Sequence, residues 1–348
     1  MPMQKINKTI RIVSSTEARL SSISKRSRES VLAVLTKHYM DVQIIIVNNT
    51  EDLEALVASA PDLVFLGMKY IPDGDSWLTG PNKIWISQYL MEHGITHTGS
   101  GHIAHQLELS KQLAKQKVMN AGLMTSPYFV INQDQVHEVR NTGYTYPSFV
   151  KPTNRGGGVG IDADSIVHNF NELESKIISI AVNLKSDSLI ENYLPGREFS
   201  VAILKDEYHD KYLSMPVELT AEPDVNGDCV ISGTTKSSNT EIVMPVDDER
   251  LKDKLNTLAL DVFMELGARD YGRIDIRLDA DGVPHFLEAN LLPSLISGYG
   301  SFPKACEINI GWGYERMILA IVKLAFSRNS DDYRAIYEQV PNFQQTSV

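Results

Sequence analysis

Two carboxylates, an amide and an arginine stand at alternating positions in one segment of the chain. The segment reads Gly272-Arg-Ile-Asp-Ile-Arg-Leu-Asp-Ala-Asp-Gly-Val-Pro-His-Phe-Leu-Glu-Ala-Asn290, and its Asp281-Gly282 pair is typical of a tight hairpin turn. A turn centred on Ala280-Asp281 places Asp275 opposite Phe286. Side chains alternate between the two faces of a strand, so a one-residue slip would separate the polar groups. In this register the side chains that share one face include Arg273, Asp275, Glu288 and Asn290.

This predicted face has the chemistry of a magnesium site. Carboxylate and amide oxygens are hard ligands that suit Mg²⁺ better than zinc, and nucleotide phosphates and water usually complete the coordination. The arginine would stabilise charge that develops on a reacting oxygen. The alternative is the solvated polar face of an ordinary hairpin, but the intervening Ile274, Ile276 and Leu287 are apolar. Pro284 lacks a backbone donor and indicates an edge strand or a bulge.

A second segment, Phe149-Val-Lys-Pro-Thr-Asn-Arg-Gly-Gly-Gly-Val-Gly160, combines a short strand, a lysine and four glycines. Glycines let backbone N–H groups approach phosphate oxygens closely, and Lys151 adds a cation at the end of the strand. The lysine precedes the glycines, so the spacing is neither that of a P-loop nor that of a Rossmann dinucleotide site. The pattern favours a phosphate-binding loop, and a flexible surface turn is the alternative.

Between these two segments, Ser188–Ile203 places Glu191 and Glu198 on either side of a Pro-Gly turn. A turn between strands can offer backbone N–H and C=O groups to a nucleotide base, and a glutamate can accept hydrogen bonds from ribose hydroxyls. Taken alone, two exposed glutamates around a turn are the better interpretation.

Composition limits the class of protein. The chain has 348 residues, of which 43% are hydrophobic and 22% charged, which is ordinary for a globular protein of two or three domains. The net charge of -11 argues against nucleic acid as the main partner, because phosphate backbones require clustered Lys and Arg. An anionic substrate is still compatible with this charge, since a few lysines can be focused in one cleft.

The cysteines and the apolar runs indicate the compartment. Cys229 and Cys306 form no C-x-x-C pair, which fits a reduced, cytoplasmic protein better than a disulfide framework or a zinc site. No apolar stretch follows the basic N-terminus, so we expect no secretory signal. No run of about 18 apolar residues occurs, so we expect no membrane-spanning helix.

The elements that must position these groups begin with an alternation of strands and helices. Apolar runs predict strands at Ile10–Val13, Val42–Val47 and Asp62–Gly67. Helical spacing predicts helices at Glu17–Tyr39 and Asp52–Ser59. This βαβαβ rhythm predicts a parallel sheet covered by helices, and hence an α/β fold in the N-terminal part.

Later elements mix helices with further strands. We expect one helix over Ile103–Ala121, ended by Gly122, and a last helix over Glu315–Phe326. A helix over Asp248–Leu266 precedes the carboxylate hairpin, and residues 224–240 form a weakly patterned loop. Short strands are predicted at Tyr128–Ile131, Ser148–Val150, Ser188–Glu191 and Glu198–Leu204.

A lysine and three motifs occur in the order of a known superfamily. The series consists of Lys111, Lys151 with its glycines, Glu191 to Glu198, and the hairpin with Arg273, Asp275, Glu288 and Asn290. It resembles the ATP-grasp ligases, most closely the D-alanine–D-alanine ligase family, from about Glu17 to Ala305, and the resemblance is weak before residue 95. The resemblance implies a three-domain ATP-grasp fold with a parallel-sheet N-terminal domain and an α+β C-terminal part. The implied domains are 1–100 (substrate), 101–194 (central lid) and 195–348 (catalytic).

The resemblance also implies a role for each matched residue, with ATP and Mg²⁺ as cofactors. Arg273 would steady the transferring phosphate, Lys236 would be the mobile-loop lysine over the γ-phosphate, and Glu17 would hold the ammonium of the first substrate. An acid oxygen would attack the γ-phosphate, and an amine would then displace phosphate from the acyl phosphate. The implied magnesium ligands are Asp275, Glu288 and Asn290. The implied nucleotide-binding residues are Lys111, Lys151, Gly156, Gly157, Gly158, Gly160, Glu191, Tyr193, Leu194 and Glu198.

Departures from the family cluster on the substrate side. An N-terminal Gly-Gly motif is absent, and lost hydrogen-bonding groups normally penalise the original substrate. This branch resembles the ligases of mycosporine-like amino acid biosynthesis, which implies attachment of an amino acid to a mycosporine activated as its phosphate. The replaced positions are Lys69-Tyr70 for a His-Gly pair, Gly157 for a serine, Ser237 for a tyrosine and Ser294 for a glycine.

Two other functions stay open. One is an ordinary D-alanine–D-alanine ligase or another dipeptide ligase. The other is a nucleotide-binding regulatory protein without catalysis, against which the complete set of polar residues on the hairpin argues. For a ligase, the expected partners are small-molecule acid and amino acid substrates, with neither nucleic acid nor membrane. The family resemblance also implies a homodimer.

Overall fold

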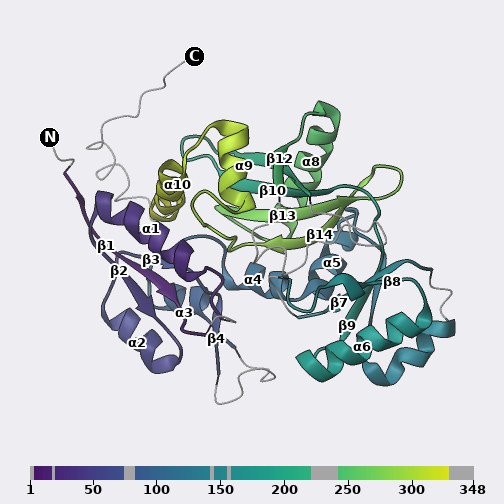
Figure 1. Ribbon diagram of the computed structural model, residues 1–348. Helices are drawn as coiled ribbons and strands as arrows, with labels where there is room; N and C mark the ends of the chain where they lie inside the picture. The colour runs from purple at the N-terminus through teal and green to yellow at the C-terminus, as the bar shows by residue number, and fades with distance from the viewer. Residues whose placement is uncertain are drawn as a thin grey trace.

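The structure is a computed structural model that describes residues 4–17, 20–73, 83–141, 145–154, 158–220 and 242–328. A parallel sheet lies at the left of Figure 1, a five-stranded sheet at the upper centre and a four-stranded sheet at the lower right. None of the helices in these residues combines the length and the apolar character needed to cross a membrane.

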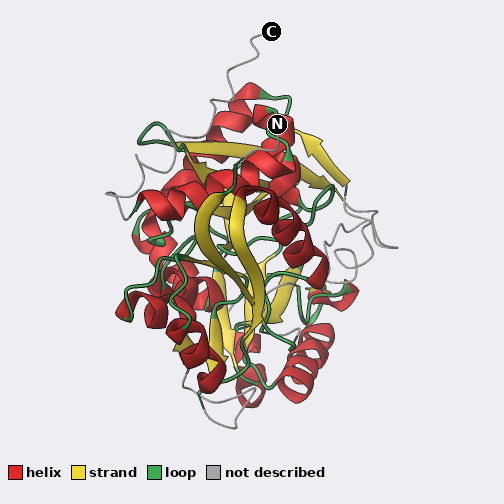
Figure 2. Cartoon of the chain, turned by 90° about the vertical axis from the view of Figure 1, so that its left-hand side faces the viewer, coloured by secondary structure: helices red, strands yellow, loops and turns green. Residues whose placement is uncertain are grey.

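The first sheet is parallel, as predicted, with strand order β2-β1-β3. Its strands are β1 (Ile6–Ser14), β2 (Tyr39–Ile46) and β3 (Leu63–Leu66), connected by α1 (Lys25–His38) and α2 (Thr50–Ala58). Helices pack beside the long strands in the side view of Figure 2. Parallel strands end at the same edge of a sheet, so the loops after β1 and β3 lie together at that edge.

The helix predicted over Glu17–Tyr39 is wrong in its first turns. α1 begins only at Lys25, because Ser24 has an extended backbone and its hydroxyl accepts a hydrogen bond from the Ser27 amide (3.1 Å). The preceding residues turn toward the end of β3, where the Ser22 amide donates to the Gly67 carbonyl (2.8 Å). The serines that precede the apolar stripe therefore form a cap and a turn, not helix.

The single helix predicted over Ile103–Ala121 is also wrong, because it is two helices. α4 (His102–Leu109) ends at Ser110, whose φ of -102° and ψ of 90° are extended. Ser110 then caps α5 (Lys111–Asn120) by accepting from the Leu113 amide (3.4 Å). The break makes Lys111 the first residue of α5, with its amide donating to the Thr153 carbonyl (3.2 Å) just beyond β7. The end of α5 near Gly122 is as predicted.

Two further antiparallel sheets follow in the chain, and the second of them, with four strands, holds the start of the glycine-rich segment. The small sheet consists of β4 (Tyr70–Pro72) and β5 (Lys83–Trp85), followed by α3 (Ile86–Glu92). The four-stranded sheet has the antiparallel order β6-β9-β7-β8 and is covered by α6 (Phe170–Leu184). Its elements are β6 (Tyr128–Ile131), η1 (Gln133–Asn141), β7 (Ser148–Pro152), η2 (Ala163–Ser165), β8 (Ile166–Val167) and β9 (Ser188–Asn192).

The five-stranded antiparallel sheet has the order β12-β11-β10-β13-β14. Its strands are β10 (Glu198–Lys205), β11 (Tyr212–Thr220), β12 (Ile242–Pro245), β13 (Tyr271–Leu278) and β14 (Pro284–Asn290). Helix α8 (Glu249–Glu265) packs on one face of the sheet, and α9 (Ser301–Ile310) packs on the other. Helix α10 (Tyr314–Ser327) packs against α9 and also against α1 and β3, so it joins this sheet to the first one.

Three hydrophobic clusters follow this arrangement. One extends from the first sheet through α10 to the α9 side of the five-stranded sheet, the second lies between α8 and the opposite side, and the third lies under α6. Ala114 and Val118 of α5 belong to the second cluster. The first two clusters each contain residues from both sides of a predicted domain boundary. The packing therefore does not separate the chain at residues 100 and 194, and the division into domains stays a prediction.

Candidate active site

The turn of the carboxylate hairpin differs from the prediction by one residue. Leu278 pairs with Pro284, and the Asp279 amide donates to the Val283 carbonyl (3.0 Å), so the loop has three residues instead of two. Gly282 has a φ of 76°, a left-handed conformation that glycine adopts readily. A three-residue loop of this kind is a common hairpin connection. The predicted two-residue turn was therefore wrong. This one-residue difference alone would place Arg273 and Asp275 on the opposite face of the hairpin from Glu288 and Asn290.

A bulge reverses the effect of that slip. The register shifts between Asp275 and Ile276, so Asp275 lies opposite Glu288 and not opposite Phe286, and Arg273 lies opposite Asn290. An extra residue in one strand restores the alternation that the turn had displaced. The predicted common face of the four polar residues is confirmed, although the predicted pairing is not. β14 is an edge strand, as Pro284 indicated.

Asp275 is the most heavily bonded member of this face. Two guanidinium nitrogens of Arg273 lie 2.9 Å from its two oxygens, and the Asn290 amide donates to it at 2.9 Å. The hydroxyl of Ser200, on the neighbouring strand β10, donates at 2.8 Å. Arg273 is fixed further by a bond from its Nη1 to the Ser301 hydroxyl (2.9 Å) at the start of α9. The carboxylate and the guanidinium are thus buried and pre-oriented on β13, between β10 and the edge strand β14.

Glu288 connects the hairpin to α5. Its carboxylate lies 3.5 Å from the ammonium of Lys111, the residue that the break at Ser110 places first in α5. Burial lowers the pKa of Lys111 despite the opposing effect of Glu288. The predicted lysine and the predicted metal ligand therefore belong to one cluster.

Glu191 lies between two lysines, one of which the sequence did not indicate. Its Oε2 is 2.5 Å from the Lys151 ammonium, and its Oε1 forms an ion pair with Lys115. Glu191 is only 2% exposed, so the interpretation of this residue as an exposed glutamate is wrong. Burial alone would raise the pKa of its carboxyl, but the ammonium groups of Lys115 and Lys151 hold that pKa below its usual value. Lys115 and Lys111 are four residues apart on one helix, a spacing that could have drawn attention to Lys115.

A pocket opens between the four-stranded sheet and the hairpin. Apolar side chains of Phe149, Ile161 and Leu287 line part of it, as a planar ligand requires. These three residues were not predicted as site residues. The predicted residues that line the pocket are Lys151, Gly158, Glu191, Tyr193, Leu194, Glu198, Asp275 and Glu288.

Arg277 organises the end of the pocket near the Pro-Gly turn. Its guanidinium donates to Glu198 (3.1 Å), to the Tyr193 hydroxyl (3.1 Å) and to the Gly196 carbonyl (3.1 Å). It also lies 5.1 Å from the centre of the Tyr193 ring. Arg277 alternates with Asp275 and Arg273 along β13, which is the signal that could have identified it.

Several predicted residues fall elsewhere or outside the described residues. Gly160 has a φ of 80°, a left-handed conformation that glycine adopts readily, and a Cβ there would lie 2.6 Å from the Leu184 side chain. Glu17 is exposed in the loop after β1, and no described contact connects it to the pocket. Gly156, Gly157 and Lys236 lie outside the described residues, as does the predicted loop at 224–240.

The substitution at Lys69 creates a buried ion pair. The Lys69 ammonium lies 2.7 Å from Glu108, which is also within 3.2 Å of His105 Nδ1. The same carboxylate accepts a hydrogen bond from the amide of Leu291 (2.9 Å), directly after Asn290. Although burial opposes ionisation, Lys69 and His105 lower the pKa of Glu108. The edge of the first sheet is thereby tied to the end of the hairpin.

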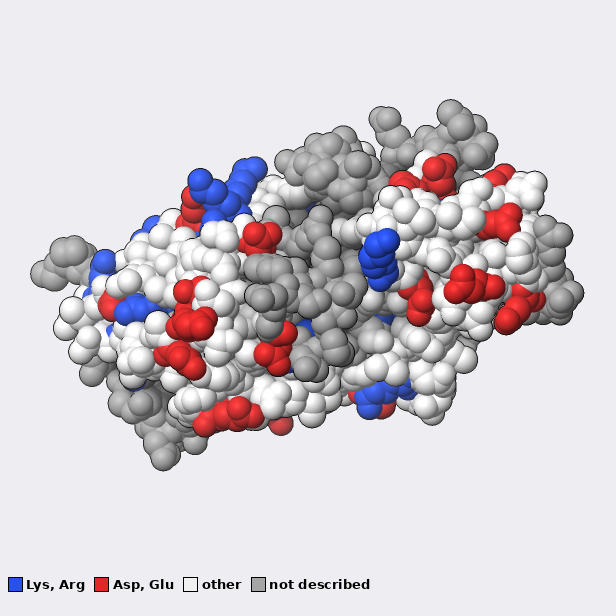
Figure 3. Space-filling model, turned by 90° about the horizontal axis from the view of Figure 1, so that it is seen from below, with Lys and Arg blue, Asp and Glu red and all other residues white. Residues whose placement is uncertain are grey.

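The outer surface differs in charge from this pocket. On the face seen in Figure 3, the basic side chains of the described residues lie in small groups among acidic ones and form no continuous band. By contrast, Lys111, Lys115 and Lys151 are buried within one cluster. The acidic chain thus concentrates cations at its pocket.

Comparison with known proteins agrees with this geometry. The family model described as "D-ala D-ala ligase C-terminus" matches residues 118–323. The D-alanine–D-alanine ligase of Cupriavidus taiwanensis is 26% identical over 306 residues, which cover 87% of each chain. That of Alcanivorax borkumensis is 30% identical over 212 residues, which cover 60% of this chain and 63% of the relative.

Two solved structures show the same fold. The Bacillus anthracis D-alanine–D-alanine ligase complexed with ATP has a TM-score of 0.71 and 20% identity, covering 93% of this chain and 99% of its own. The VanG D-Ala:D-Ser ligase of Enterococcus faecalis has a TM-score of 0.68 and 18% identity, covering 92% and 99%. The predicted ATP-grasp fold is confirmed by this likeness. Because the family model matches more than half of the chain, this protein belongs to the D-alanine–D-alanine ligase family, whose members form C–N bonds.

Proposed function

We propose that this protein is an ATP- and Mg²⁺-dependent ligase that joins the amine of an amino acid to an acid through an acyl phosphate. One observation supports this most strongly. Asp275 and Glu288 lie opposite each other on β13 and β14, with Arg273 and Asn290 opposite each other one step along the same face. Buried lysines stand beside this face, and a pocket lined in part by Asp275 and Glu288 adjoins it.

The donor set of this face fits magnesium. In the part of the chain that the structure describes, no group of three or more His, Cys, Asp or Glu side chains forms a metal site. A cation here would therefore use Asp275, Glu288 and the Asn290 amide oxygen together with water and phosphate oxygens, which is the usual composition of magnesium sites beside nucleotides. When bound, the metal would neutralise charge on the transferring phosphate.

The residues of the chain account for the rest of the chemistry. An acid oxygen attacks the γ-phosphorus of ATP, and ADP leaves. The amine nitrogen then attacks the acyl carbon, the C–O bond to phosphate breaks, and the amine proton is released. Arg273, held by Asp275 and Ser301, would stabilise the negative charge that develops in both steps. Lys236 is proposed to close over the γ-phosphate and keep water from the acyl phosphate.

The pocket accounts for nucleotide binding. Glu198, oriented by Arg277, would accept from the ribose hydroxyls, and the chain at Tyr193-Leu194 would hold the base. Lys111 and Lys151 would contact phosphate oxygens. The glycines proposed for close approach of the loop to the phosphates are Gly156, Gly157, Gly158 and Gly160.

For the substrates, D-alanine or a related amino acid is favoured over a mycosporine. The relatives are named D-alanine–D-alanine ligases, and no comparison supports the mycosporine reading. The observation that keeps a different acid in view is the Lys69–Glu108 pair in place of a His-Gly pair. Glu17 is proposed to hold the ammonium of the first substrate. A homodimer is proposed from the family resemblance alone, and a cytoplasmic location from the cysteine usage.

A product assay tests the function. The purified chain is given ATP and Mg²⁺ with D-alanine, with D-alanine plus D-serine, or with mycosporine-glycine plus serine, threonine and glycine. ADP release is followed, and products are identified by mass. We expect a dipeptide to form with D-alanine. If the only product is a serine or threonine adduct of the mycosporine, the assignment of D-alanine as substrate is overturned. ADP release that survives Asp275→Ala and Glu288→Ala would refute catalysis at the hairpin.

A further inference from the structure

Lys115 and Lys151 pair with the two oxygens of one buried carboxylate, that of Glu191. The two lysines differ in their other contacts and in their access to the pocket. Lys115 has no exposed surface, and its three N–H donors face three acceptors. These are Glu191, the Thr125 hydroxyl (2.5 Å) and the Phe286 carbonyl (3.4 Å). The Thr125 hydroxyl itself donates to Phe286 (2.7 Å). Lys115 is therefore fixed in place by α5, by the loop before β6 and by β14.

Lys151 is held far less firmly. Among the described residues, the partner of its ammonium is Glu191 (2.5 Å), with the Phe149 ring centre 5.7 Å away. It lines the pocket, whereas Lys115 does not. Lys151 is thus the cation of this pair that can turn toward an anion in the pocket.

Such a turn has an electrostatic requirement. Glu191 is 2% exposed, and a buried carboxylate without a counter-charge is strongly unfavourable. If Lys151 leaves Glu191 for a phosphate, Lys115 remains on the other oxygen and keeps the carboxylate compensated. Without Lys115, Lys151 would be the one described cation left in direct ion-pair contact with Glu191 and would be retained there.

We propose that Lys115 is a positioning residue, which keeps Glu191 compensated so that Lys151 can exchange this carboxylate for a nucleotide phosphate. The inference rests on the proposed function, because it requires a nucleotide in the pocket. It assigns to Lys115 no contact with the nucleotide, and its effect reaches the ligand only through Glu191 and Lys151. Removing Lys115 should therefore weaken the contribution of the phosphates to the binding free energy of ATP and leave the contribution of the nucleoside unchanged.

The experiment compares the dissociation constants of ATP and adenosine, measured by calorimetry on the full chain. In Lys115→Met we expect the ratio of adenosine to ATP dissociation constants to fall at least about tenfold, the loss of one charge-assisted hydrogen bond. Adenosine affinity changes little. The matched control is Lys117→Met, which removes an exposed ion pair with Glu265 (3.0 Å) from the same helix and leaves the ratio unchanged.

A second variant removes the charge that causes the effect. In Glu191→Gln, Lys151 is no longer held by a carboxylate, so adding Lys115→Met should leave the ratio at the value of Glu191→Gln alone. This comparison also decides the matter if Lys115→Met by itself does not fold. A ratio that is unchanged in Lys115→Met, or that falls equally in both backgrounds, overturns the inference. Wild-type protein that binds ATP no better than adenosine would refute the proposed function, and the inference with it.

Discussion

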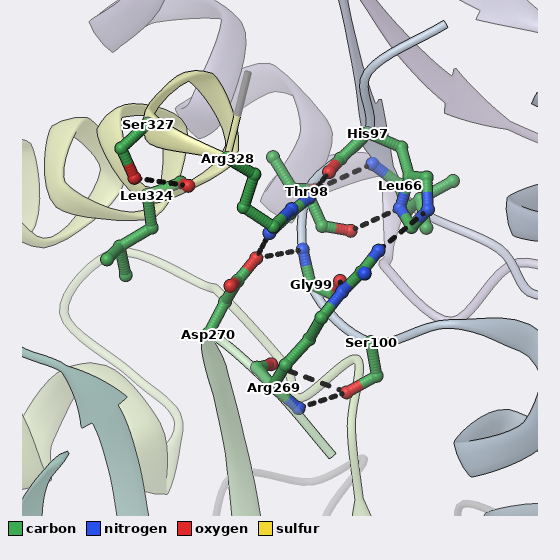
Figure 4. A network of polar contacts seen from close by, with 10 residues as sticks. All are labelled: Leu66, His97, Thr98, Gly99, Ser100, Arg269, Asp270, Leu324, Ser327 and Arg328. Atoms are coloured by element: carbon green, nitrogen blue, oxygen red, sulfur yellow. Dashed lines mark hydrogen bonds and ion pairs between the residues drawn. The ribbon is translucent and has the colours of Figure 1, made fainter. Parts of the chain in front are cut away.

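His97 lies in a polar network that joins the first sheet to the start of β13, and its protonation state should control the stability of the fold at acid pH. Figure 4 shows the ring between the loop 97–100 and Arg269. Its Nδ1 lies 3.1 Å from the Thr98 carbonyl, and its Nε2 lies 3.1 Å from a guanidinium nitrogen of Arg269. The ring therefore donates through Nδ1 and accepts through Nε2, which only the neutral form can do.

The surroundings of the ring disfavour a proton. Burial, and then the nearby charges of Arg269, Arg328 and His105, lower the pKa of His97 from 6.5 to about 3, although its bond to Thr98 opposes this. Between these values the unfolded chain binds a proton that the folded chain does not, so stability falls as the pH is lowered through 6.5. The slope is about 1.4 kcal/mol per pH unit, and the loss reaches about 2 kcal/mol at pH 5.

The variant His97→Gln keeps an acceptor for Arg269 but does not titrate. We expect its free energy of unfolding to fall between pH 7 and pH 5 by about 2 kcal/mol less than that of the wild type. Urea unfolding at pH 7, 6 and 5, followed by tryptophan fluorescence and circular dichroism, measures this difference. His93→Gln removes an exposed histidine directly after α3 and controls for the loss of an imidazole as such. Equal slopes in the wild type and His97→Gln would refute the reasoning.

Three further changes test other parts of the fold and site. Asp275→Asn should lower kcat by about 100-fold or more, since it removes a charge that orients Arg273, and retained ADP release would contradict the assignment. Gly67→Ala should destabilise the first sheet by about 1–3 kcal/mol in urea unfolding, because its Cβ would lie 2.2 Å from the Val13 carbonyl oxygen. Lys69→Met should lower the free energy of unfolding by about 3–5 kcal/mol, because it leaves Glu108 buried without the ammonium of Lys69. Adding Glu108→Gln should recover much of this stability. If the double variant melts at as low a temperature as Lys69→Met, the unpaired carboxylate is not the cause.

Local patterns in the sequence predicted the elements better than their ends. Alternation and apolar runs were sufficient for the parallel sheet and the hairpin. They were insufficient where a polar side chain decides a boundary: Ser24 and Ser110 cap helices inside stretches with continuous helical spacing. Strand β11 was not predicted, and its Pro216 explains why, since proline is disfavoured inside a sheet. Pro216 is tolerated because β12 pairs only with residues 217–220 of β11.

The site was predicted where its residues are close in sequence and missed where they are not. The hairpin places its polar residues on one face through a slip and a bulge that offset each other, so the correct face was predicted from an incorrect register. Lys115 has the sequence context of an ordinary helix lysine. Its role depends on Glu191, which is brought beside it only when the four-stranded sheet packs against α5. No local pattern carries that information.

The charges around the pocket show why net charge is a poor guide to a ligand. Three buried lysines, Lys111, Lys115 and Lys151, face the two carboxylates of Glu191 and Glu288. Among these five described side chains the lysines outnumber the carboxylates by one, in a chain whose net charge is -11. Burial lowers the pKa of Lys115 to about 8, with Glu191 opposing this change and the neighbouring ammonium of Lys151 adding to it. A phosphate of the proposed nucleotide would add negative charge beside these lysines, so we expect the cluster to favour an anionic ligand over a neutral one although the chain as a whole is acidic.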